Sequence, residues 1–200
     1  MKKAGVNRRQ VHRTISRGLQ SRFKKDITRK VRADVARAKA IMLAEFRAHP
    51  VTKEIEAGPS SANISGTLGG IGNLFSFIGF DRGDNPIRPV RRILETSTRL
   101  NSVRKIQGDR LAFEVTIDIP SKEDIAGASP LPWAAARSWV MGIEQGLSGF
   151  GTFLVKPGEG RSGGGIQVSG VIRAGGFKNK KYVSAILASL QSNLMKFLRQ

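Results

Sequence analysis

His12 and His49 are the two histidines of this 200-residue chain, and no cysteine accompanies them. Zinc and related metals are held by several imidazole, thiolate or carboxylate ligands that the fold brings together. The two histidines lie far apart and neither has a carboxylate pair nearby, so we expect no metal site. Glu123 and Asp124 are adjacent rather than facing, which is typical of a turn or of the start of a helix and not of an acid–base pair.

Residues 158–163 read GEGRSG and match the G-x-G-x-x-G spacing of dinucleotide-binding loops. That motif must open a helix, with an acidic residue about 20 positions further on. Here a second strand is expected at 166–173, and the residues near position 180 are basic, so we predict a flexible hairpin loop. No P-loop is present, and a catalytic serine would lack a positioned base. We therefore expect a protein that is not an enzyme, with no cofactor and no small-molecule substrate.

Positive charge is the strongest chemical signal. The formal net charge is +19, and residues 1–40 hold 14 basic residues against two acidic ones, which predicts an acidic partner such as nucleic acid. A solvated helix, a disordered tail or an Arg-rich transit peptide would have a similar composition. Phe23 is the only aromatic residue among the first 45, so contact with the phosphate backbone is expected rather than base stacking. The candidate contacts for nucleic acid or an acidic partner are Arg8, Arg9, Arg13, Arg17, Arg22, Lys24, Lys25, Arg29, Lys30 and Arg32.

An apolar residue recurs every four positions through this basic region. The members of this stripe are Val11, Ile15, Leu19, Phe23, Ile27, Val31 and Val35. The spacing predicts a long helix over 7–48 that ends before Pro50, with Gly18 as a possible interruption. One large apolar group per turn is a thin seam, so we expect the first half of this helix to need a partner.

The segment between Glu56 and Asp81 carries no charge and is rich in glycine. A membrane span needs about 20 predominantly apolar residues. Glycine and polar residues interrupt this segment throughout, so no membrane contact is expected. The segment is either tucked under its own domain or is a loop that becomes ordered when neighbouring subunits close over it. The candidate anchors of such a subunit-interface loop are Leu68, Leu74, Phe75, Phe77 and Phe80.

The remaining chain mixes strand and helix patterns. Residues 111–119 alternate between apolar and polar, which predicts a half-buried strand paired with 101–106 through a turn at 108–109. The other expected elements are a short helix near 90–98, a helix over 133–147, strands at 151–156 and 166–173, and a closing helix from about Lys180.

These patterns predict an α+β fold with a long basic N-terminal helix and a small, mostly antiparallel sheet packed with two or three helices. The expected organisation is a basic helical arm over 1–50, a neutral Gly-rich interaction loop over 51–84 and an α+β body over 85–200.

The order of these elements, with the SGTLGG segment at 65–70, resembles the neck and tail-completion proteins of tailed bacteriophages. In that family an N-terminal helix leads to a T-G-x-L-type loop, a small sheet and a C-terminal helix; this chain has S-G-T-L there and an additional expected helix over 133–147. The segment from His49 to Phe80 is also similar to virion structural proteins of environmental phages. The resemblance implies a ring of copies around the DNA channel between portal and tail.

Two hypotheses about function follow. The first is a non-enzymatic head–tail connector of the virion, present in the host cytoplasm during assembly, that contacts other neck, portal or tail proteins and double-stranded DNA. The second is a nucleic-acid-binding protein of ribosomal or nucleoid type that uses the basic helix for phosphate contact. An enzyme with an unrecognised site is a third alternative.

Overall fold

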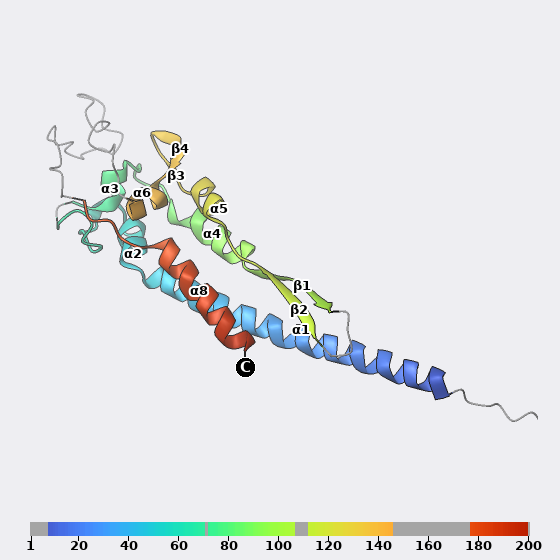
Figure 1. The fold of residues 1–200 in the computed structure, drawn as a ribbon. Coiled ribbons are helices and arrows are strands. Elements are labelled where there is room, and N and C mark those ends of the chain that lie inside the picture. The colour runs from blue at the N-terminus through green and yellow to red at the C-terminus, as the bar shows by residue number, and fades with distance from the viewer. Residues whose placement is uncertain (1–7, 71, 107–111, 146–176, 200) are drawn as a thin grey trace, which may run out of the picture.

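A computed structural model describes residues 8–70, 72–106, 112–145 and 177–199, with side chains from residue 21 onward. The fold is α+β, as predicted: the other elements gather along one half of a long N-terminal helix (Figure 1). The helices are α1 (Arg8–Ala48), α2 (Pro50–Glu56), the short 3-10 helix η1 (Gly58–Ser60), α3 (Leu74–Ile78), α4 (Ile87–Ser97), α5 (Lys122–Gly127), α6 (Trp139–Gln145) and α8 (Val183–Leu198). The strands are β1 (Arg99–Lys105), β2 (Phe113–Asp118), β3 (Pro130–Leu131) and β4 (Ala134–Ser138).

Helix α1 confirms the prediction made from the four-residue stripe, and it runs through Gly18 without a break. Its 41 residues correspond to a length of about 60 Å at 1.5 Å per residue. The helix ends where His49 takes an extended conformation before Pro50, as expected for the residue that precedes a proline. Among the side chains of α1 that the structure describes, from residue 21 onward, the buried ones lie in its second half: Val31, Val35, Ala38, Met42 and Phe46.

Helix α8 covers the packed half of α1 (Figure 1). Its buried face consists of Val183, Ile186, Leu190, Leu194 and Phe197. The two helices are antiparallel, because Tyr182, at the start of α8, stacks on Phe46, whereas Phe197, near its end, lies beneath Arg37. The Arg37 guanidinium carbon is 4.6 Å from the centre of the Phe197 ring, within cation–π range.

Strands β1 and β2 form the predicted antiparallel pair, with Val103 opposite Val115. The register shifts between Leu100 and Ser102, which is a β-bulge. Strand β1 packs along α1, and Val103 is buried there. The predicted turn at 108–109, the strands at 151–156 and 166–173 and the glycine loop at 158–163 lie outside the described residues.

The predicted helix over 133–147 is wrong in its first part. Residues Ala134–Ser138 form β4, which pairs with β3, and the helix that follows is α6 over Trp139–Gln145. Pairing with β3 replaces the helical pattern here, and next to it the Trp133 indole donates to the carbonyl of Ile78 at 3.1 Å. The hydroxyls of Ser129 and Ser138 also pair at 2.6 Å and close the β3–β4 hairpin.

The two short helices around the hairpin follow their sequence signals. Helix α4 begins three residues before the expected 90–98 and buries Ile87, Val90 and Leu94. Helix α5 contains the adjacent acidic residues in its first turn, and Ser121 and Asp124 form a reciprocal capping box. The expectation of a turn or helix start at 123–124 is confirmed.

Candidate functional site

A buried carboxylate organises the neutral segment at 57–80. The Glu54 side chain, on α2, is fully buried, and its Oε1 accepts from the Leu74 amide at 2.7 Å and from Asn63 Nδ2 at 2.8 Å. Its Oε2 accepts from the Ser65 amide at 2.6 Å. Three donors from a 12-residue stretch therefore converge on one side chain, and charge-assisted bonds of this kind are among the stronger hydrogen bonds in proteins. These bonds hold the segment against α2, so it is not an open loop.

Asn63 extends this network outward. Its Oδ1 accepts from the amides of Leu68 at 3.0 Å and Gly70 at 3.2 Å, while its Nδ2 donates to Glu54. The turn needs backbone conformations that other residues rarely adopt: Gly70 has φ +89°. Lys180 Nζ donates to the Ser65 carbonyl at 3.0 Å, so the residues that lead into α8 also bind the turn around Ser65.

Helix α3 lies within this segment and was not predicted. Asn73 caps its start by accepting from the Ser76 amide at 2.9 Å, and Gly79 ends it in the left-handed conformation with φ +88°. An asparagine followed six residues later by a glycine was a visible signal for this short helix. The glycine-rich composition around it favoured a loop prediction instead.

The predicted interface anchors belong to the chain's own core. Leu74, Phe75 and Phe80 are buried, whereas Leu68 and Phe77 are half-buried and pack against that core. Of the two placements considered from the sequence, the structure shows the first, in which the anchors are tucked under their own domain. In this conformation Leu74, Phe75 and Phe80 have almost no surface to offer a neighbouring subunit, and an interface role for the five anchors stays a prediction. The buried residues of segment 51–84 belong to the same hydrophobic core as those of the body.

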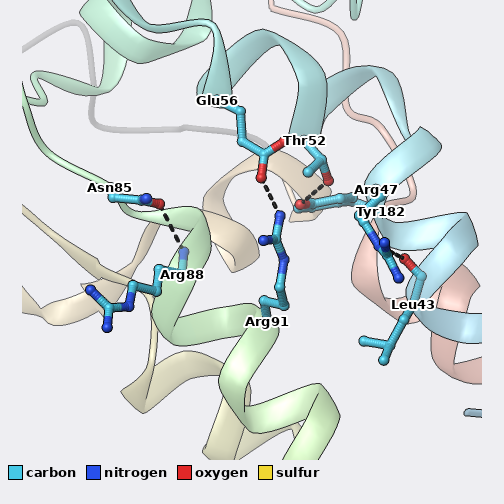
Figure 2. A network of polar contacts seen from close by, with 8 residues as sticks. All are labelled: Leu43, Arg47, Thr52, Glu56, Asn85, Arg88, Arg91 and Tyr182. Carbon is cyan, nitrogen blue, oxygen red and sulfur yellow. Dashed lines mark hydrogen bonds and ion pairs between the residues drawn. The ribbon is translucent and has the colours of Figure 1, made fainter. Parts of the chain in front are cut away.

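A buried aromatic cluster joins α1, α2 and α8 behind this segment. The Tyr182 hydroxyl pairs with Thr52 Oγ1 at 2.6 Å, and burial raises the pKa of this phenol. The centres of the His49 and Tyr182 rings are 4.7 Å apart. Burial lowers the pKa of His49. Figure 2 shows that Thr52 and Tyr182 lie beside the ion pair of Glu56 and Arg91, which links α2 to α4. The Thr52–Tyr182 bond and the contact of the His49 and Tyr182 rings join α2 to the start of α8, so we interpret the cluster as structural.

A hollow lies between α5, α6 and α8. Its volume is ≈ 230 Å³, and Ile125, Met141 and Leu187 form part of its lining. Glu144 also lines it, but its Oε1 already accepts from the amides of Tyr182 and Ser184 at 3.1 and 2.7 Å. Within the described ranges, no three His, Cys, Asp or Glu side chains are grouped so that they could hold a metal ion. In the same ranges no helix is both long and apolar enough to cross a bilayer.

The basic residues predicted to contact nucleic acid or an acidic partner lie on α1. Those whose side chains are described are all exposed: Arg22, Lys24, Lys25, Arg29, Lys30 and Arg32. Arg8, Arg9, Arg13 and Arg17 are placed on the helix by its backbone, and their side chains lie outside the described part. Among the described acidic residues, one pairs with this group: Asp26 contacts Arg29 at 2.9 Å, and both side chains are exposed.

The N-terminal half of α1 projects beyond the body (Figure 1). The first buried residue along the described side chains is Val31, and no residue from 21 to 30 is buried. The apolar stripe nevertheless continues into this half, where Ile27 is half-buried and Phe23 is 45% exposed. The projecting helix therefore has an apolar line that extends the packed face of α1 but receives little cover from the described chain.

No family model, no curated protein and no solved structure matches this chain. What the protein does has therefore to be inferred from its shape, charge and packing.

Proposed function

We propose that this chain is a non-enzymatic structural protein of the neck of a tailed bacteriophage. In this proposal copies of the chain form a ring that joins the portal to the tail around the DNA channel, and the protein is located in the virion. The supports are the resemblance of the SGTLGG segment and of the element order, and the α+β body with a long N-terminal and a closing C-terminal helix. Its partners are further copies of itself and other neck, portal or tail proteins.

One observation carries this proposal: the apolar stripe of α1 runs past the body and leaves Phe23 exposed. From Arg8 to Lys30 the projecting helix spans about 35 Å. In proteins most of the stability of a helix comes from the packing of its apolar face, so this projecting helix would gain stability from a packing partner. A neighbouring copy that packs against this stripe would cover Phe23 and Ile27 just as α8 covers the packed half of the same helix. A ring of identical subunits, each contacting the next in the same way, follows from such a contact if the rotation between subunits closes.

The first test is to fractionate a lysate of the native source by sedimentation and to identify by mass spectrometry which particle carries the chain. The proposal expects the chain in virion fractions at a few to a dozen copies per particle. Its presence in ribosome or nucleoid fractions instead would refute the neck assignment.

A second test addresses the contact itself. A photoreactive phenylalanine analogue placed at position 23 is expected to cross-link to another copy or to a neck protein in assembled particles. The matched control carries the analogue at Ile64, which is also exposed, at 55%, but lies on the body. Equal cross-linking from both positions, or none from position 23, would contradict the proposed contact.

The second candidate function is a nucleic-acid-binding protein of ribosomal or nucleoid type. The observation that favours it is the concentration of exposed basic side chains on the projecting half of α1. It expects the chain in ribosome or nucleoid fractions, which makes the sedimentation test decisive between the two.

A further inference from the structure

Helix α1 has two different faces where its projecting part meets its packed part. Arg22, Lys25, Arg29 and Arg32 follow one another at steps of three, four and three residues. At 100° per residue, these steps place all four on one arc of about 80°. Phe23 and the buried Val31 lie about 140° from the centre of the basic arc, and the buried Val35 lies about 100° from it. The face that is free to pack on protein and the basic face are therefore separate.

The basic face is open and its charge is barely compensated. All four side chains belong to exposed residues. Among the described acidic residues, Asp26 alone forms an ion pair with any of these four, and its partner is Arg29. The Arg29 side chain is 82% exposed and the Asp26 side chain 57% exposed. Ala33 and Ala36 continue the same face as exposed small residues, so no bulky side chain of the helix stands between this surface and a flat partner.

Duplex DNA carries enough negative charge to match this face. The four basic residues occupy about 15 Å of helix, and duplex DNA carries one negative charge per about 1.7 Å of axis, or roughly nine over that length. The exposed Phe23 lies about 140° from the centre of the basic arc, so this face has no aromatic ring for the stacking on which single-strand binders depend. Phosphate contact alone gives affinity without reading bases.

We propose that this face of α1, formed by Arg22, Lys25, Arg29 and Arg32, binds the sugar–phosphate backbone of duplex nucleic acid without sequence preference. In the neck ring proposed above, the face would point to the DNA in the channel while the apolar stripe packs on the neighbouring subunit. Only that location depends on the proposed function; the binding itself is a property of the single chain.

The test uses the full chain and a fluorescein-labelled 30-base-pair DNA duplex of mixed sequence. Fluorescence anisotropy gives the binding constant at salt concentrations from 50 to 200 mM, and the slope of log K against log salt counts the phosphates contacted, at about 0.9 per contact. The test variant replaces all four residues by glutamine, which preserves helix propensity and removes four charges.

The matched control replaces four exposed basic residues of the body by glutamine: Arg88, Arg92, Lys122 and Arg137. Both variants lose the same net charge, so a difference between them reports position and not total charge. We expect the arm variant to lower the magnitude of the slope by about 3 to 4 and the control to leave it within about one.

Several outcomes would overturn the inference. Equal loss of slope in both variants would mean diffuse attraction by net charge. No duplex binding by the unmodified chain at 50 mM salt would leave an acidic protein surface as the partner of this face. Tighter binding of a 30-nucleotide single strand than of the duplex would also contradict it. None of these outcomes bears on the neck proposal, which depends on the particle in which the chain is found and on the cross-link from position 23.

Discussion

Replacing Glu54 by glutamine tests whether one buried carboxylate holds the neutral segment in place. The change preserves size and shape but converts one acceptor oxygen into an NH₂ donor. If that donor takes the place of Oε2, it faces the amide of Ser65, now 2.6 Å from the oxygen, and two donors oppose each other. If it takes the place of Oε1, it opposes both Leu74 N–H and Asn63 Nδ2. Neither orientation satisfies all three donors.

The magnitude follows from the first, less damaging orientation. One hydrogen bond to a charged group is lost, at about 1.5–3 kcal/mol, and the two that remain become neutral and weaker. The free energy of unfolding is therefore expected to fall by about 2–4 kcal/mol. For a chain of this size that corresponds to a decrease in Tm of roughly 5–15 °C.

Thermal and urea unfolding followed by circular dichroism measures this change. The control is Glu56→Gln, two residues away on α2, because Glu56 forms a partly exposed ion pair with Arg91. Such pairs contribute at most about 1 kcal/mol. If Glu54→Gln and Glu56→Gln shift the midpoint equally, the converging bonds on Glu54 do not stabilise the fold and the account of the segment is refuted.

Three further predictions concern single side chains. Because burial lowers the pKa of His49, the folded state favours the neutral ring. The contribution of His49 to stability is therefore full above its unfolded pKa of about 6.5 and falls as the pH drops below that value. Urea unfolding at pH 7.5 and 5.0 should show this loss, and His49→Asn should reduce it. Phe23→Ser is expected to leave the Tm of the isolated chain within about 1 °C, whereas Phe46→Ala should cost about 3–5 kcal/mol in chemical unfolding, and equal effects would contradict the division of α1 into packed and projecting halves. Tyr182→Phe leaves the buried Thr52 hydroxyl without its partner and should lower the unfolding free energy by about 1–2 kcal/mol, whereas an unchanged urea midpoint would mean that Thr52 finds another partner.

Elements with a sustained local pattern could be predicted from the sequence. The four-residue stripe and Pro50 gave the extent of α1 within a residue, and strict alternation gave β2 and its pairing with β1. The closing helix was recognisable because its apolar residues repeat at three and four positions over four turns. In each of these elements the apolar residues repeat at the spacing of the helix or strand, so the face that packs in the folded chain is already visible in the sequence.

Elements decided by distant contacts could not be predicted. The stretch Ala134–Ser138 has a helical composition, but it pairs with β3, and the Trp133 indole beside it donates to the carbonyl of Ile78, 55 positions away. Glu54 looks like a surface residue in its local sequence, and its burial follows only from donors that lie 9 to 20 positions later. The position of the anchors in the core could not be chosen from the sequence either, because a neutral apolar segment suits a core and an interface equally well.

The antiparallel pairing of α1 with α8 has a consequence for synthesis of the chain. The face of α1 that contains Met42 and Phe46 emerges from the ribosome early, but the helix that covers it is completed about 150 residues later, at Leu198. At roughly 5–20 residues per second that interval lasts about 8–30 s. Throughout it the nascent chain displays an apolar face next to a strongly positive segment, and the mutual repulsion of those charges opposes association between chains on neighbouring ribosomes. We therefore expect the arginines and lysines of α1 to oppose aggregation of the chain while it is still being synthesised.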